Sequence, residues 1–385
     1  MKKIFIIALA LAPMLSYAKK PAKAEEPQPA YTFTDVKINP ATPVKDQASS
    51  GTCWSFSGLG FIEGDLLAQG KGEYDLSEMW IARHTYFEKA VKYARMHGTI
   101  NLGAGGATHD VYNMIDKYGI VPEEVYTGLH YGTDEHRHGE LDGVILAYME
   151  SVIKNNNRTL TTAWQDGLNG ILDAYLGELP ESFVYEGKEY TPREFADMLG
   201  IKGSNYQSYT SFTHHPFGTE FAVEVPDNWA WCPSINVPID EMIEIMDKAI
   251  EDGGSVLWAS DVSEPGFQYN KGFAVLPEMD LKNMNDSEKA KWSNLTQREM
   301  MRQMMNFETA VEEEVVTQES RQAGFDNYTT TDDHGMVITG VAKDQNGNKF
   351  YKVKNSWAAD NIYDGYFYVS EAFVKAKTMN IVVKK

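Results

Sequence analysis

Four residues of this 385-residue sequence have side chains and surroundings suited to chemistry: Cys53, His334, Asn355 and Gln47. Cys53 lies in DQASSGTCWSF (46–56), where Ser and Thr precede an apolar repeat of helical spacing, so we expect it in the first turn of a helix. Unpaired backbone N–H groups at a helix start favour an anion and lower the pKa of a thiol. The pattern favours a nucleophilic cysteine over the alternative, a small buried hydrophobe.

A cysteine nucleophile needs a base, and the base needs a partner that orients it. His334 opens the strand-like run HGMVITGV, and Asn355 lies near the end of the run KFYKVKNSW. We expect Asn355 to fix the tautomer of His334 and Trp357 to shield their hydrogen bond from water. Gln47 can offer its side-chain amide to a developing oxyanion beside the backbone N–H of Cys53.

The second cysteine of the chain, Cys232, leaves two interpretations open for Cys53. A bridge between the two cysteines would remove the nucleophile, so the disulfide and the catalytic interpretation exclude each other. Cys232 adjoins Trp231, and we interpret it as part of the core.

The elements that must position these residues fall into two parts. The first third has helical spacing over 49–67, 76–98 and 107–119, and helical patterns continue from 140 to 199 and over 237–254. The last third contains short β-branched and aromatic runs at 255–262, 335–343, 349–357, 365–370 and 380–384. The sequence therefore predicts a helical lobe followed by an antiparallel sheet lobe, with a Met- and Glu-rich helical insertion between strands at 279–319.

Several motifs together resemble the papain-like cysteine peptidases. The stretches PVKDQASSGTCWSF, DDHGMVITGV and KVKNSW are similar to that family's glutamine–cysteine, histidine and asparagine regions. The stretch LGAGGATHDVYNMIDKYGIVPEEVY looks like its Gly-Gly edge, so the resemblance implies that the backbone of Gly105 and Gly106 pairs with substrate. His334 and Asn355 lie much further downstream than the about 130–150 residues usual in papain itself, and Ser50 replaces the usual first cysteine.

Both departures, the serine at position 50 and the long spacing, resemble one branch of the family, the aminopeptidase C and bleomycin hydrolase group. TPREFADMLG, SINVPIDEM, EDGGSVLWASDV and VTQESRQAGFDNYTTTDDHGMVITG also resemble that branch. The resemblance implies the α+β, two-lobed papain-like fold, a helical lobe plus an antiparallel β-barrel lobe, with large helical insertions at about 130–232 and 279–320. It also implies a homo-oligomer, a hexamer, whose inward cleft excludes folded proteins.

The start of the chain has the composition of a targeting segment. Lys2 and Lys3 precede an apolar run over 4–15 and a small-x-small site at 16–18, so we expect a signal peptide at 1–18. A flexible leader should occupy 19–34 and the papain-like peptidase domain 35–385. We therefore expect export to a periplasm or beyond the cell.

The composition of the chain limits the classes of molecule that it can bind. The formal net charge is −20, which argues against nucleic acid, and no later segment is apolar for long enough to span a bilayer. We expect peptide substrates, no membrane partner, no cofactor and no metal, because thioester chemistry needs neither. We interpret His130, His136 and His138 as a solvated loop rather than a metal site, and His214-His215 as a turn.

The expected activity is exopeptidase hydrolysis near the N-terminus of peptides, by an aminopeptidase or a dipeptidyl-peptidase. Asp332 and Asp333 could bind the substrate's α-ammonium or raise the pKa of His334; the alternative is a solvated acidic loop. In the resembled group a C-terminal arm receives that ammonium, whereas the strand NIVVKK here ends at Lys385. We therefore predict release of dipeptides at least as readily as single residues. An endopeptidase with an open cleft and a non-catalytic peptide-binding scaffold remain the alternatives.

Overall fold

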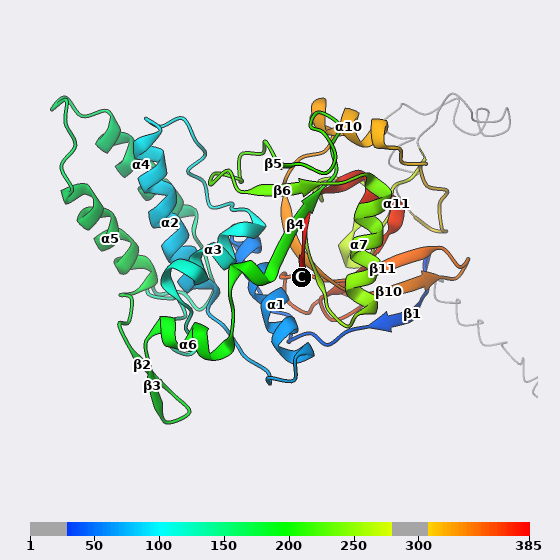
Figure 1. Cartoon of the computed structure of the whole chain (residues 1–385), viewed down its shortest axis with the longest axis horizontal. Helices are drawn as coiled ribbons and strands as arrows, with labels where there is room; N and C mark the ends of the chain where they lie inside the picture. The colour runs from blue at the N-terminus through cyan, green and yellow to red at the C-terminus, as the bar shows by residue number, and fades with distance from the viewer. Residues whose placement is uncertain (1–28, 279–306) are drawn as a thin grey trace, which may run out of the picture.

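A helical lobe and a sheet lobe lie on either side of one central helix, α1 (Cys53–Ala68), as Figure 1 shows. The computed structural model describes residues 29–278 and 307–385. The predicted division into a helical lobe and a sheet lobe is confirmed.

The helical lobe is a layer of helices that occupies the side of the molecule away from the sheet (Figure 1). Its helices are α2 (Glu78–Arg95), α3 (Thr108–Tyr118), α4 (Gly139–Ile153), α5 (Ala163–Leu176) and α6 (Pro192–Leu199). Local signals set their starts: the Ser77 side chain accepts from Trp80 N at the start of α2, and Thr191 and Glu194 form a capping box before α6. A short hairpin, β2 (Phe183–Tyr185) with β3 (Lys188–Tyr190), precedes α6.

The sheet lobe is built on one sheet whose strands run in the order β5-β6-β4-β13-β7-β10-β11-β12-β9-β8, with β1 also pairing with β10. The strands are β1 (Phe33–Ile38), β4 (Tyr206–Thr210), β5 (Glu220–Ala222), β6 (Pro233–Asn236), β7 (Val256–Ser260), β8 (Phe267–Gln268), β9 (Phe273–Ala274), β10 (His334–Asp344), β11 (Lys349–Lys354), β12 (Tyr366–Ser370) and β13 (Thr378–Lys384). The pairing is antiparallel except for β4 with β6 and β12 with β9.

Three helices accompany the sheet: α7 (Ile239–Glu251), α10 (Gln318–Asp326) and α11 (Glu371–Lys377). The apolar face of α7 carries Met242, Met246 and Ile250, which are buried against the sheet. This spacing of apolar residues is that of an amphipathic helix covering one face of a sheet.

Helix α1 is buried on every side rather than on one face. All of its residues from Trp54 to Leu66 are buried, because α3 packs on one side and β10 on the other. The core of the helical lobe extends through α1 to Leu257 and Val337 of the sheet. Strand β13 ends beside the far end of this helix, where Lys384 Nζ lies 2.7 Å from Asp65 Oδ1.

Two expected boundaries differ from the observed elements. The predicted leader extends to residue 34, but β1 begins at Phe33 and Tyr31 is already buried among aromatic side chains of the sheet lobe. The stretch 130–232, expected to be helical, is helical as far as Leu199 apart from the β2–β3 hairpin, and then supplies β4 and β5 to the sheet. The signal peptide and most of the leader and of the second insertion lie outside the described residues.

Three other expectations have clear outcomes. Cys53 and Cys232 are both free thiols, so the disulfide interpretation of Cys53 is wrong. His136 and His138 are buried, so the solvated loop expected around them is wrong at those two positions. Within residues 29–278 and 307–385, no helix has the length and apolarity needed to cross a membrane.

Candidate active site

Cys53 is the first residue of α1, as predicted, and it lies in a pocket with His334. The first turn of α1 has no side-chain cap and no acidic residue. Ser55 N and Phe56 N donate to Thr52 O, which leaves the backbone N–H groups of Cys53 and Trp54 to stabilise a negative charge at the sulfur or on a bound carbonyl oxygen.

The histidine and the asparagine lie on neighbouring strands. Strand β10 starts at His334 and pairs antiparallel with β11, with Val337 opposite Lys354. This register brings the start of β10 beside the residues that follow β11, and His334 Nε2 lies 2.7 Å from Asn355 Oδ1. The ring of Trp357 lies over the imidazole at 4.5 Å between centroids, so it shields this hydrogen bond as expected.

Asn355 is oriented by two donors. Its Oδ1 also accepts from Ser356 N at 2.8 Å, while its Nδ2 is buried without a hydrogen-bond partner. An acceptor facing His334 Nε2 requires a proton on that nitrogen, which leaves Nδ1 to exchange a proton with the thiol. A buried Nδ2 without a hydrogen-bond partner is energetically unfavourable, so this orientation of Asn355 reduces stability.

Burial makes a single charge unfavourable on either reacting group. It raises the pKa of the Cys53 thiol to about 12, an effect that backbone hydrogen bonds with Gly335 and Trp54 oppose. It lowers the pKa of His334 to about 4, although the bond to Asn355 acts in the other direction. Proton transfer from the thiol to the imidazole creates both charges together, and their mutual attraction offsets the burial cost.

Gln47 is held so that its amide nitrogen remains as the donor. Its backbone N–H donates to Ser356 O at 2.9 Å, and its side-chain Oε1 accepts from Ser356 Oγ at 2.7 Å. With Oε1 occupied, Nε2 is the group of this side chain left to donate to an oxyanion near Cys53.

The pocket is partly open to solvent, and residues from both lobes line it. Its apolar walls come from Val223, Val225, Ala259 and Met379. Cys53 and His334 line it together with three carboxylates, Asp227, Asp332 and Asp333. A free cysteine, an oriented imidazole and an oxyanion donor beside one pocket are the requirements of acyl transfer through a thioester.

A model of the Peptidase C1-like family matches residues 12–327 and 276–385. The chain belongs to the Peptidase C1-like family. It is a papain-like cysteine peptidase, and the family and branch predicted from its motifs are confirmed.

Relatives of this C1-like peptidase include aminopeptidase C of Streptococcus thermophilus, which is 25% identical over 89% of this chain and 80% of the relative. Aminopeptidase C of Lactococcus lactis subsp. cremoris is 24% identical over the same shares. The crystal structure of pepw from Lactobacillus rhamnosis has a TM-score of 0.70 and 21% identity, covering 92% of this chain and 83% of that chain, which supports the fold.

The two glycines of the predicted substrate edge have different surroundings in this peptidase. Gly106 lines the pocket, and a Cβ there would lie 2.7 Å from Trp54 and 2.8 Å from Asp110 Oδ2, so only glycine fits. The carbonyl of Gly105, by contrast, accepts a hydrogen bond from Lys89 Nζ. That carbonyl is therefore already occupied, and Gly106 is the better placed of the two to meet a substrate.

The two predicted acids of the C1-like peptidase also differ. Asp332 is partly buried in the pocket, where burial and the charge of Asp227 raise its pKa to about 8. Asp333 accepts hydrogen bonds from Ser263 N at 3.1 Å and Thr331 Oγ1 at 3.0 Å. The hydrogen bonds of Asp333 stabilise a loop. The carboxylate of Asp332 instead lies near other acids, Asp227 among them.

Sequence reasoning missed two residues of the site. Ser356 lies inside the motif KVKNSW, directly after Asn355, and this position could have indicated that it contacts Gln47. Asp227 has no such signal, because it lies on an irregular segment that only the fold brings to the pocket.

Proposed function

We propose that this peptidase is an exported cysteine exopeptidase that hydrolyses peptide bonds near the N-terminus of peptides. The aminopeptidase C relatives support this activity. The observation that carries it is the carboxylate pair Asp227 and Asp332 beside the nucleophile, in a pocket with apolar walls.

The proposed chemistry has two stages. Cys53 Sγ attacks the scissile carbonyl as His334 takes the thiol proton, and the oxyanion is held by Gln47 Nε2 and the Cys53 backbone N–H. His334 then gives the proton to the leaving amine, and a thioester remains on Cys53. Water, deprotonated by His334, cleaves the thioester and releases the N-terminal fragment. Asn355 holds the imidazole throughout.

The acid pair suits an α-ammonium group. The charged groups that raise the pKa of Asp332 are all acids, namely Asp227, Asp333 and Asp261. A cation entering this environment relieves their repulsion and lets Asp332 ionise. Burial raises the pKa of Asp227, the charge of Lys89 opposes this rise, and Lys89 Nζ is hydrogen-bonded to the carbonyls of Gly103 and Gly105.

Position along the cleft favours dipeptide release. Asp332 lies two residues before His334, and two residues of extended chain span about 7 Å. If the ammonium lies about that far from the scissile carbonyl, one residue separates the N-terminal residue from the scissile bond, and cleavage releases a dipeptide.

Paired substrates test the exopeptidase proposal. Hydrolysis of one decapeptide with a free N-terminus is compared with that of its N-acetylated form, in the parent enzyme and in Asp332→Asn, Asp227→Asn and Asp333→Asn. We expect Asp332→Asn and Asp227→Asn to lose at least about 10-fold in kcat/KM on the free peptide only. Asp333→Asn is the matched control: Asp333 also lines the pocket, but its carboxylate accepts hydrogen bonds from Ser263 N and Thr331 Oγ1.

Other outcomes select the alternatives. Equal losses on both peptides would exclude ammonium recognition, and rapid internal cleavage of the acetylated peptide would favour an endopeptidase. Cys53→Ala should abolish turnover while the fold is kept. If the unmodified protein neither hydrolyses peptides nor reacts with a thiol-directed epoxide, it is a non-catalytic peptide-binding scaffold.

Export is the remaining part of the proposal, and it rests on the residue pattern at 1–18. Cell fractionation combined with N-terminal sequencing tests it. We expect mature protein beginning after Ala18 outside the cytoplasm; full-length protein in the cytoplasm would refute export without affecting the chemistry.

A further inference from the structure

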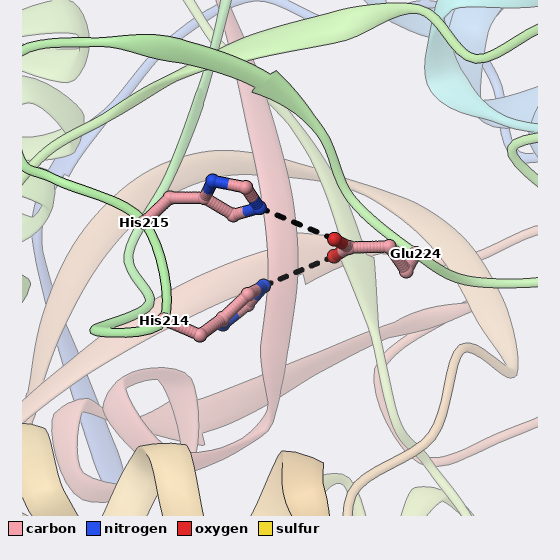
Figure 2. A group of neighbouring side chains, drawn as sticks. All are labelled: His214, His215 and Glu224. Carbon is pink, nitrogen blue, oxygen red and sulfur yellow. Dashed lines mark hydrogen bonds and ion pairs between the residues drawn. The ribbon is translucent and has the colours of Figure 1, made fainter.

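Two adjacent histidines and one glutamate converge on the outside of the pocket wall. His214 and His215 lie in the turn between β4 and β5, and Glu224 follows β5. His214 Nε2 is 3.0 Å from Glu224 Oε2, and His215 Nε2 is 3.2 Å from Glu224 Oε1. Figure 2 shows both imidazoles pointing at the same carboxylate. We propose that this His-His-Glu cluster binds one divalent transition metal ion, with zinc as the best fit.

The ligand types support zinc. Two imidazole nitrogens and one carboxylate oxygen are a donor set that zinc accepts at about 2.0–2.2 Å, with a fourth position for water. Ligand atoms at such distances lie roughly 3.3 Å apart in a tetrahedron. The three donor groups here offer atoms that all lie within 4.8 Å of one another, so small side-chain shifts complete the geometry.

The protonation states also fit. Each imidazole Nε2 faces one oxygen of the Glu224 carboxylate, so each of the two pairs shares one proton. The ion would replace the proton that each imidazole shares with the carboxylate, and each ring would carry its proton on Nδ1 instead.

A second layer of contacts orients the ligands. The side-chain amide of Gln322 of α10 lies beside His214 Nδ1, with its Nε2 at 3.1 Å and its Oε1 at 3.3 Å, and Oε1 can accept the proton that metal binding requires on Nδ1. The same Oε1 accepts from Thr213 N at 2.6 Å, which fixes the amide. His215 stacks on Phe221 with ring centroids 4.2 Å apart. Ligands held in this way lose little freedom on binding an ion.

The cluster is open to solvent. The side chains of His214, His215 and Glu224 are 28%, 38% and 57% exposed. An ion can therefore enter without unfolding of the loop, and water can complete its coordination.

The location connects this cluster to the active site. Val223 and Val225, on either side of Glu224, line the pocket, and Asp227 follows shortly after. An ion at Glu224 would tie this pocket wall to the β4–β5 turn and, through Gln322, to α10. We infer that metal occupancy sets the rigidity of the wall that faces the substrate.

Metal titration tests the proposal. Zinc also binds catalytic thiols, so calorimetry with Zn²⁺ and cobalt absorption spectroscopy are done on the full chain carrying Cys53→Ala. We expect one ion per chain, and an affinity lower by about 100-fold or more after His215→Gln or Glu224→Gln. His130→Gln is the matched control, since this exposed histidine lies outside the cluster.

Two results would overturn the proposal: no binding in the Cys53→Ala protein, or equal affinity in Glu224→Gln and His130→Gln. Glu224→Gln keeps the size of the side chain, so loss of binding with an unchanged thermal transition in the absence of metal excludes misfolding. Hydrogen exchange tests the link to the pocket. We expect slower exchange at 221–228 with Zn²⁺, and unchanged exchange on binding would refute that link.

Discussion

At the scale of single residues, Ser356 is the neighbour that gives Gln47 its orientation. The Ser356 hydroxyl donates to Gln47 Oε1, and this bond turns the amide nitrogen into the available donor. A serine with this contact acts through glutamine and touches no reacting atom. It is a positioning residue.

We expect Gln47→Ala to lower kcat by about 100-fold, the usual effect of losing one oxyanion donor. Ser356→Ala should lower kcat by about 10-fold with little change in KM, because the donor is still present but less well placed. Ser356→Thr keeps the hydroxyl and should restore most of the rate. A rise in KM alone after Ser356→Ala would instead indicate a substrate contact.

Asp332 is expected to reduce the stability of the free enzyme. Burial and Asp227 raise its pKa to about 8, above the about 3.9 of an unfolded chain. Between these values the folded state retains a proton that the unfolded state has released, so stability falls as pH rises through this window. Asp332→Asn should therefore raise the free energy of unfolding by about 1–3 kcal/mol at pH 8 and hardly at pH 4.

Urea unfolding at the two pH values measures this difference, and Asp333→Asn provides a control of opposite sign. Burial opposes ionisation of Asp333, but hydrogen bonds with Asp261, Thr331 and Ser263 lower its pKa. Its ionised form therefore contributes stability above pH 4 that is lost on acidification. A loss of stability in both variants at pH 8 would contradict the assignment for Asp332.

At the scale of elements, the contact between α1 and β10 sets the distance between nucleophile and base. A Cβ on Gly335 would lie 2.6 Å from Ser57 Oγ and 3.3 Å from the Trp54 backbone. The helix can approach the strand this closely because residue 335 has no side chain. Displacements of about 1 Å at a reacting centre can cost about 100-fold in rate.

We expect Gly335→Ala to lower kcat by about 10- to 100-fold, with a smaller loss of stability, because the added methyl group pushes α1 and Cys53 away from His334. Steady-state kinetics and thermal unfolding measured together would check this. Gly170→Ala in α5 is the matched control: that site has open space, so the helix should gain stability and the rate should not change. Normal kcat in Gly335→Ala would show that the contact is not critical.

Some helices and strands could be predicted from the sequence, and others could not. Helix α1 and strand β10 were predictable because each carries a regular run of apolar residues next to a residue with chemistry. Strand β4 was not, because its buried face is polar: Ser208 and Thr210 point inward, and Ser208 bonds to Ser234. Hydrophobic alternation is absent there, so the strand gave no periodic signal.

Some residues of the site were likewise predictable from the sequence, and others were not. Cys53, His334, Asn355 and Gln47 stand in contiguous motifs; in the structure Cys53 and His334 line one pocket, Asn355 bonds to His334, and Gln47 bonds to the neighbouring Ser356. Asp227 contacts Asn101, which is 126 residues away in the sequence, and Glu224 contacts the turn at His214 across an irregular segment without a motif. Single-sequence patterns carry no information on such pairs.

At the scale of the whole molecule, the pocket lies between the lobes and holds its acids to one side of the nucleophile. We predict that an unblocked decapeptide loses dipeptides from its N-terminus at least as readily as single residues. Mass spectrometry of timed samples would show products shortened by two residues. A ladder of single losses would refute the prediction.

The burial of α1 by both lobes has a consequence for how activity arises during folding. The nucleophile is on a helix that neither lobe encloses alone, and the imidazole is on a strand of the second lobe. A chain that has folded only its helical lobe therefore carries a thiol without a base. Such an intermediate is catalytically silent, and nascent chains are protected from one another until the lobes have docked.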